Sequence, residues 1–316
     1  MTAPLVLEWL RAGRLQLPLP GSGETAQRWR RLAQLTEIDV VAGRLAEAHT
    51  DAAAILAELG GPLPSAGELW GVWAAEPPDA IVTADGAGDA LVLDGVKAWC
   101  SGAGLCTHAL VTARLGDGRR GLFAVDLGGG AVRPLEHTWR NAGMADSDTR
   151  SVEFVGAPAV PVGGPGDYLS RPGFWFGAIG VAACWLGGAR AVAAPLYQRA
   201  AKRSVDDHLL AHLGAVDAAI AAADAALAVT AKHVDSDPCN RSGLAELRAR
   251  RVRAIVEKAA DEALIRTDRA LGPGPLCLDD RHARAVADLS VYVRQSHAER
   301  DLAALGSLAA ASHAVS

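Results

Sequence analysis

The sequence predicts an α+β fold in which a short N-terminal helical region precedes a central antiparallel β-sheet or barrel and a C-terminal four-helix bundle. Three observations support this order. Apolar residues recur at helical spacing over residues 24–59, short β-branched runs fill residues 70–162, and long helical patterns occupy the rest of the chain. The corresponding domains are residues 1–66, 67–165 and 170–316.

The N-terminal region has the three- and four-residue spacing of apolar side chains that marks an amphipathic helix. Trp29, Leu32 and Leu35 begin this pattern, and it continues to Leu59. The segment GGPLPSAGE then ends it with glycines and prolines. We therefore expect a small helical region within the first 66 residues.

The central region changes to short runs rich in Val, Ile, Leu and Thr, separated by turn residues. Asp94-Gly95 and Asp117-Gly118 are residue pairs that tolerate the positive φ of a hairpin turn. Because these runs follow one another at even spacing without helices between them, they predict an antiparallel sheet or barrel.

Four long helical patterns follow, over residues 176–203, 208–234, 243–271 and 282–306. Ser242 is a candidate N-cap for the third, and Gly272-Pro273 is expected to end it. Long helices with short connections predict an up-down bundle.

Composition excludes several classes of function. The 316 residues carry a formal net charge of −5, which argues against a nucleic-acid or anionic-membrane surface. The five cysteines lack metal-ligand spacing, so we expect reduced thiols, no metal and a cytoplasmic protein. His208 and His212 have the i, i+4 spacing of two metal ligands, but no third ligand accompanies them.

The segment WRNAGMADSDTRSVEFVGAPAVP, residues 139–161, is similar to the last β-domain strands of acyl-CoA dehydrogenases. The matching residues are Gly143-Met144, Ser147-Asp148-Thr149, Val152-Glu153-Phe154 and Val160-Pro161. Two further segments, LDGVKAWCSGAG and WLGGAR, resemble the flavin-facing strand and the first bundle helix of this family. The resemblance covers residues 65–306 and implies the same order of helical, β and helical parts.

This resemblance implies an FAD site between the β domain and the bundle, completed by a neighbouring subunit. The implied cofactor-binding residues are Trp99, Cys100 and Ser101 on the flavin-facing strand, Arg203 for the phosphates, and Gly272. Ser101 keeps the hydroxyl of the family's Thr.

The chain also departs from the family pattern. Ala75 replaces the Thr that precedes a Glu-Pro pair, and Asp206-Asp207 follows Arg203 where the family has Phe-Gly. Two carboxylates beside a diphosphate would repel it. These departures leave the FAD assignment open.

The family's chemistry also requires a carboxylate base, and its usual Tyr-Glu-Gly-Thr loop is absent from this chain. The position of that Glu aligns near Ser296, within residues 288–306, which read as one continuous helix. The nearest replacements are His297 and Glu299, which would point about 200° apart on an unbroken helix. A solvated or subunit-facing charged helix is the alternative interpretation of this stretch.

Three functions follow as hypotheses. The first is a flavoprotein that oxidises an acyl-CoA or related small molecule at its α and β carbons, with hydride transfer to FAD. The second is a non-catalytic binding or partner subunit of the same fold, and the third is a flavin-dependent oxygenase. The resemblance further implies a homodimer or homotetramer, with a paralogous partner subunit as another possibility.

Overall fold

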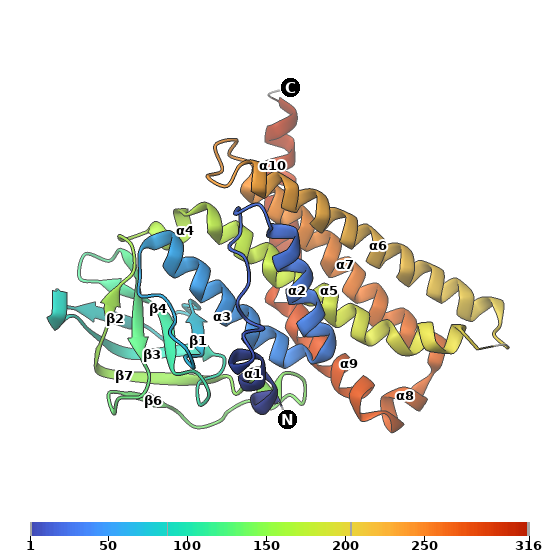
Figure 1. Cartoon of the computed structure of the whole chain (residues 1–316), viewed down its shortest axis with the longest axis horizontal. Coiled ribbons are helices and arrows are strands. Elements are labelled where there is room, and N and C mark those ends of the chain that lie inside the picture. The colour runs from blue at the N-terminus through green and yellow to red at the C-terminus, as the bar shows by residue number, and fades with distance from the viewer. Residues whose placement is uncertain (1, 87, 203, 315–316) are drawn as a thin grey trace. The chain divides into compact units, whose positions relative to one another are not determined.

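The computed structural model describes residues 2–86, 88–202 and 204–314, which form two compact units (Figure 1). The β unit contains the residues up to Leu17, Leu45–Asn141 and Ala145–Phe174. The helical unit contains Pro18–Arg44, Ala142–Met144 and the residues from Trp175 onward. The division into domains at residues 1–66, 67–165 and 170–316 stays a prediction.

The N-terminal region consists of α1 (Thr2–Arg11), α2 (Thr25–Ile38) and α3 (Val40–Leu59). The helical pattern of residues 24–59 is interrupted at Asp39, whose backbone is extended with φ −154° and ψ 121°. The Asp39 carboxylate accepts a hydrogen bond from Ala42 N at 2.7 Å, so it caps the start of α3. The single apolar pattern of residues 24–59 is therefore divided into two helices, α2 and α3.

In the described chain, eight strands form one sheet in the β unit. The strands are β1 (Trp70–Trp73), β2 (Val82–Asp85), β3 (Val92–Cys100), β4 (His108–Leu115), β5 (Arg120–Asp126), β6 (Val132–Pro134), β7 (Arg150–Pro158) and β8 (Val160–Pro161). Their order is β6-β7-β3-β2-β4-β5-β8, with β1 also pairing with β4. Two short 3-10 helices, η1 (Gly88–Ala90) and η2 (Ala145–Ser147), lie in the connections.

The sheet is mixed, so the prediction of a purely antiparallel sheet was wrong for two strand pairs. Strands β1 and β2 each pair in parallel with β4, and the remaining pairs are antiparallel. The predicted turn at Asp117-Gly118 joins β4 and β5, with Gly118 at φ 81°. The turn predicted at Asp94-Gly95 was wrong, because Gly95 lies inside β3 at an irregularity of its pairing with β7. An Asp-Gly pair thus lies at a bulge in one place and at a hairpin turn in the other.

Apolar side chains on both sides of the sheet form the core of the β unit. On one side, Trp73, Leu93 and Phe154 belong to a large buried cluster. A second cluster joins the apolar face of α3, through Ile55 and Leu56, to residues of β1, β4 and β5. Burial of this helix face explains why α3 keeps its amphipathic pattern.

The helical unit is built on α5 (Pro172–Ala200, shared at its start with the β unit), α6 (Asp207–Ser236) and α7 (Ala245–Leu271). The remaining helices are α4 (Asp167–Ser170) in the β unit, then α8 (Pro273–Leu278), α9 (Asp280–Tyr292), η3 (Val293–Gln295) and α10 (Glu299–Ala314). The predicted N-cap Ser242 was wrong, because the side chain of Asn240 accepts the hydrogen bond from Ala245 N at the start of α7. Helix α7 ends at Gly272, as the sequence predicts.

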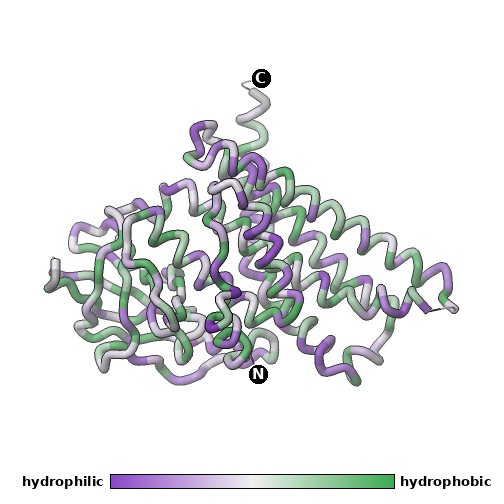
Figure 2. The backbone as a smooth tube through the Cα atoms, in the orientation of Figure 1, coloured by the Kyte–Doolittle hydropathy of each residue, from purple (hydrophilic) through white to green (hydrophobic). Residues whose placement is uncertain are grey.

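Helices α5 and α6 are both long and strongly apolar, as Figure 2 shows along their length. By length and composition alone, each could cross a membrane, and the apolar stretch of α5 is mostly buried in the structure. Helix α5 also meets α2 closely, because a Cβ at Gly187 would lie 2.1 Å from Ala33 O. The glycines of the WLGGAR segment therefore serve close helix packing.

Candidate functional site

An exposed tryptophan stands at the end of β3 in the β unit. The pairing of β3 with β7 shifts between Lys97 and Cys100, and Trp99 lies in this bulge with φ 61°. A left-handed conformation costs a bulky L-residue roughly 1–2 kcal/mol. The Trp99 side chain is 63% exposed, and its ring meets the Trp139 ring edge-on with centroids 6.2 Å apart. The flat face of the indole is therefore exposed at a cost in the free energy of folding.

Lys97 and Cys100, two residues before Trp99 and one after it, are buried in the β unit. Lys97 is buried, and its Nζ donates to Thr112 O and to Thr112 Oγ1, both at 2.7 Å. Burial lowers the pKa of Lys97 to about 8, and the charge of Glu76 partly opposes this. Cys100 is fully buried, and burial raises the pKa of its thiol. Since the Cys100 thiol faces the core, any contact of this residue with a surface ligand would come from its backbone.

Three hydroxyl groups form a row beside this bulge. Thr149 Oγ1 donates to Ser101 Oγ at 3.1 Å, and Ser147 Oγ lies 2.7 Å from Thr149 Oγ1. Gly102 N also donates to Ser147 O at 2.7 Å, which fastens the Ser-Asp-Thr motif to the end of β3. We call Ser101, Thr149 and Ser147 the hydroxyl row. The row and Trp99 both belong to the β unit, so their arrangement is set within one compact body.

In the helical unit, the stretch predicted as one continuous helix is broken. Helix α9 passes into η3, Ser296 is extended, Ala298 has φ 45°, and α10 begins at Glu299. Two side chains cause the break. Ser296 Oγ accepts from Ala298 N at 3.2 Å, and Asp301 accepts from His297 N at 3.0 Å. These side chains replace helical hydrogen bonds with capping bonds, which a pattern of apolar spacing does not reveal.

The two predicted bases lie on the surface at this break. His297 is exposed, with Nδ1 3.7 Å from the Asp301 carboxylate. Glu299 is exposed in the first turn of α10. Their roles as bases stay predictions.

A carboxylate that the sequence analysis missed lies directly against the break. Ser296 is buried, and its Oγ donates to Glu257 Oε2 on α7 at 2.6 Å. The Glu257 side chain is 16% exposed, and Arg294 Nη1 lies 3.9 Å from its Oε1. The sequence holds one signal of this residue, because Arg253, Glu257 and Asp261 recur at i, i+4 along one face of α7.

Arg253, one helical turn before Glu257 on α7, is held by an aromatic ring and a backbone carbonyl group. The Arg253 guanidinium lies 4.5 Å from the centre of the Trp185 ring, and it donates to Ala178 O at 2.9 Å. Burial lowers the pKa of Arg253, while Asp301 opposes that shift. Arg250 pairs with Asp301 at 3.1 Å. Although burial raises the pKa of Asp301, the His297 N–H and nearby cations outweigh it, so the carboxyl group has a lowered pKa.

The other residues implied by the resemblance are placed as follows. Gly272 ends α7 with φ 66°. Arg203 lies outside the described residues. Asp206 is the N-cap of α6 and accepts from Leu209 N at 2.8 Å, so one of the two acidic residues that depart from the family pattern has a structural use. Within the described chain, no group of three His, Cys, Asp or Glu side chains is arranged to hold a metal.

The motif Gly143-Met144 is explained by packing inside the helical unit. A Cβ at Gly143 would lie 2.1 Å from Ala287 O on α9, so only glycine fits there. Met144 N donates to the Asp288 carboxylate at 2.6 Å, and Met144 itself has φ 58°. This motif therefore joins a short segment to α9.

No protein-family model and no curated protein sequence matches this chain. Solved structures do match it over nearly its whole length. FkbI, described as acting in biosynthesis of a methoxymalonyl extender unit, has a TM-score of 0.80 at 17% identity and covers 98% of this chain and 93% of its own. TdsC from Paenibacillus sp. A11-2, solved with FMN and indole, has a TM-score of 0.76 at 18% identity and covers 96% and 94%.

A third solved structure, the steroid ACAD Tcur3481-Tcur3483, has a TM-score of 0.74 at 21% identity and covers 99% of this chain and 90% of its own. These similarities extend over both units and include helices before and after a central sheet. The resemblance predicted from residues 139–161 is therefore confirmed at the level of the fold. The chain has the fold of the acyl-CoA dehydrogenases.

Proposed function

We propose that this chain is a flavin-dependent oxidoreductase that acts on an acyl thioester or a related small molecule. The observation that carries the proposal is Trp99, a strained and exposed indole beside the hydroxyl row. Strained backbone conformations cluster at ligand sites, so an exposed aromatic residue in such a conformation motivates this hypothesis. A planar ring system can stack on an indole and accept hydrogen bonds at its edge.

The residues present fit the ring end of a flavin. Trp99 offers a face, and the hydroxyl of Ser101 is oriented by Thr149 at 3.1 Å. Ser101 O is itself held by Trp73 Nε1 at 3.0 Å, so the hydroxyl has a fixed support. Trp99, Ser101, Arg203 and Gly272 are the proposed cofactor-binding residues, with Cys100 contributing its backbone. A bound flavin would supply the reversible hydride acceptance that protein side chains lack.

FAD is the cofactor that the sequence resemblance implies, and TdsC was solved with FMN. The choice between them depends on the adenylate end of the cofactor. Because FMN lacks that end, a preference for FAD would require contacts near Arg203 and Gly272, whereas FMN would require none there. Binding both cofactors to the same protein preparation therefore tests the proposed phosphate contacts.

Within this function, Glu257 is our first choice as the base that takes the α-proton of a thioester. Its carboxylate lies against Ser296, where the family's base aligns, and a serine hydroxyl holds it at 2.6 Å. The carboxylate is half-buried, with Arg294 near its other oxygen, so its position is constrained on both sides. His297 and Glu299 remain the alternative bases.

Flavin binding is tested by adding FAD or FMN to purified protein and recording the visible spectrum and intrinsic tryptophan fluorescence. We expect a bound yellow flavin, and loss of at least about tenfold in affinity in Trp99→Ala. Leu63→Ala is the matched control, because Leu63 is an apolar side chain of the β unit with the same exposed fraction of 63%. A protein that takes up neither flavin contradicts the proposal and favours the non-catalytic partner subunit.

The base is tested by incubating the flavin-loaded protein with a series of acyl-CoA thioesters in heavy water and measuring deuterium uptake by mass spectrometry. We expect Glu257→Gln to lower α-proton exchange by about 100-fold or more. Glu262→Gln, on the same helix and paired with Arg266, is the matched control. If His297→Ala or Glu299→Gln abolishes exchange while Glu257→Gln does not, the base assignment moves to that residue.

A second candidate function is a flavin-dependent oxygenase. Two observations favour it: a match to dibenzothiophene monooxygenase TdsC, at 18% identity, and the serine that stands at the usual position of the catalytic glutamate. Oxygen consumption by protein supplied with reduced flavin and a substrate, without exchange of thioester α-protons, would support this function over the first.

A further inference from the structure

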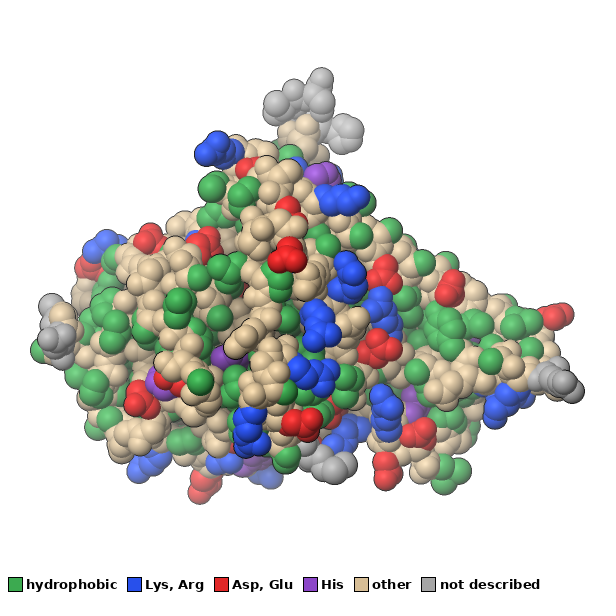
Figure 3. Space-filling view, in the orientation of Figure 1, with side chains coloured by type: hydrophobic (Ala, Val, Ile, Leu, Met, Phe, Trp, Pro, Cys, Tyr) green, Lys and Arg blue, Asp and Glu red, His purple; other side chains and the backbone are tan. Residues whose placement is uncertain are grey.

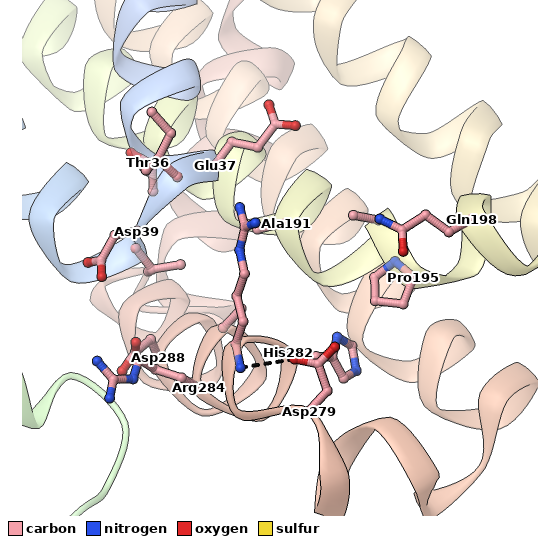
Figure 4. Close-up of a pocket in the computed structure, with 15 residues that line it drawn as sticks. Thr36, Glu37, Asp39, Ala191, Pro195, Gln198, Asp279, His282, Arg284 and Asp288 are labelled. Carbon is pink, nitrogen blue, oxygen red and sulfur yellow. Dashed lines mark hydrogen bonds between the residues drawn. The ribbon is translucent and has the colours of Figure 1, made fainter. Parts of the chain in front are cut away.

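The helical unit contains a cavity of about 330 Å³ that the proposed flavin chemistry does not use. It is formed by the end of α2 and the start of α3, the C-terminal half of α5, and α9 (Figure 4). All of these segments belong to the same unit, so the cavity lies within one compact body, and it is partly open to solvent. Its volume lies at the lower end of ligand pockets, which suits a small molecule.

The cavity combines an apolar surface with many charges. Val40, Ala191, Ala194, Pro195 and Ala285 provide apolar lining. Four carboxylates and two guanidinium groups also line it, from Glu37, Asp39, Asp279, Asp288, Arg281 and Arg284. The question is which of these charges already serve the fold.

Three of the carboxylates are engaged by backbone N–H groups. Asp39 accepts from Ala42 N at 2.7 Å. Asp279 is the N-cap of α9 and accepts from the backbone N of Arg281 and of His282, each at 3.0 Å. Asp288 accepts from Met144 N at 2.6 Å. These side chains hold helix ends and a loop in place, so the fold already uses part of their hydrogen-bonding capacity.

Glu37 and Arg281 are different. Among the described residues, neither side chain makes a hydrogen bond or ion pair, although both line the same cavity. Glu37 is half-buried, at the end of α2, and Arg281 is exposed in the first turn of α9. They come from different elements, and they do not pair with each other. One cavity therefore presents an uncommitted negative charge and an uncommitted positive charge.

Two further side chains that line the cavity, His282 and Gln198, are uncharged. His282 is 3% exposed, and burial lowers its pKa, with Asp268 and Asp279 opposing the shift. Its Nδ1 has no hydrogen-bond partner in the described chain. The amide of Gln198 lines the cavity from α5, and Figure 4 shows it on the side of Pro195. These two side chains add no net charge to the site.

We propose that this cavity binds a small zwitterion of the size of a free amino acid. Glu37 receives the ammonium group and Arg281 receives the carboxylate, as two charge-assisted contacts. The apolar lining from α5 and α9 contacts the side chain of the ligand. The ligand supplies both of the charges that the protein leaves unpaired, which a simple amine or a simple carboxylic acid cannot do.

The test is isothermal titration calorimetry of the full chain with the common L-amino acids, measured one at a time. For the amino acid that binds most tightly, the decarboxylated amine and the deaminated acid are titrated in the same buffer. We expect each of these two analogues to bind at least about tenfold more weakly, because each loses one charged hydrogen-bonding group.

Glu37→Gln and Arg281→Gln should each weaken binding of the amino acid by about tenfold or more. The matched controls are Glu24→Gln, exposed at the other end of α2, and Arg241→Gln, exposed before α7; both should keep the wild-type Kd. Melting temperatures of all four variants establish that each is folded. No binding by any amino acid, binding of the amine alone with equal affinity, or binding unaffected by both pocket variants would each overturn the proposal.

Discussion

A single buried histidine links helix and sheet in the β unit. His49 on α3 is 7% exposed, and its Nδ1 accepts a hydrogen bond from Trp70 N at 3.2 Å. Because this nitrogen accepts, the imidazole is neutral in the folded protein. Burial lowers the pKa of His49 to about 4, which the charge of Glu68 partly opposes. The full free energy of unfolding is therefore present only above the pKa of this histidine in the unfolded chain, where it is neutral in both states.

This predicts an acid-dependent loss of stability. Between pH 6.5 and pH 4, the unfolded chain binds a proton at His49 and the folded chain does not, so the free energy of unfolding falls as pH falls. The loss should be on the order of 3 kcal/mol, relative to His49→Gln, whose amide oxygen can still accept from Trp70 N. Denaturant unfolding at several pH values measures it. His233→Gln, at an exposed position on α6, should not change the pH dependence, and parallel curves for wild type and His49→Gln would contradict the assignment.

At the scale of elements, the break between α9 and α10 contains one strained residue. Ala298 has φ 45°, where glycine is favoured over alanine. We expect Ala298→Gly to raise the free energy of unfolding by up to about 1 kcal/mol. Ala303→Gly, in the interior of α10 at an exposed position, should lower it by about 1 kcal/mol. Chemical denaturation of both variants checks this, and equal destabilisation by the two would mean that residues 296–298 are helical in solution.

Helices and strands could be predicted from the sequence because each buries an apolar face of regular period. Trp29, Leu32 and Leu35 are buried as their spacing predicts. The parallel pairing of β1 with β4 could not be predicted, because it joins segments that are separated by β2 and β3. Likewise, Asp39 at the start of α3 and Asp301 at the start of α10 interrupt the apolar pattern through hydrogen bonds of their side chains.

The candidate site was predictable only in part. The bulge at Trp99 and the row through Ser101 and Thr149 lie on motifs that the sequence carries. Glu257 was missed, since its position against Ser296 depends on the packing of α7 beside a break 39 residues away along the chain. A carboxylate supplied by another helix has no fixed spacing from the position it serves.

On the scale of the whole molecule, α6 carries exposed small apolar residues at helical spacing. The stripe consists of Ala211, Gly214, Ala218, Ala222, Ala225 and Val229, all exposed in the described chain. Figure 3 shows hydrophobic side chains gathered over α6. Small side chains allow a second helix to approach closely, so α6 is the face through which we expect the homodimer or homotetramer implied by the sequence resemblance to form.

Sedimentation velocity tests this assembly. We expect wild-type protein to sediment as a dimer or tetramer, and Ala222→Glu combined with Val229→Glu to shift it toward the monomer, since buried charges without partners oppose association. Ala310→Glu, on exposed α10, is the control and should leave the assembly unchanged. A monomeric wild type at micromolar concentration would contradict the proposed role of α6.

Under the proposed function, the strained conformation of Trp99 lowers the stability of the fold while its side chain contributes to flavin binding. A glycine at this position would relieve the left-handed backbone strain at no steric cost. In a library of variants selected only for heat resistance, residue 99 should therefore drift to glycine or asparagine. In a library selected for retention of the proposed flavin, the indole should persist. Comparison of the two libraries would then show, for each residue of this surface, how much stability the native side chain costs relative to the residue that heat selection favours.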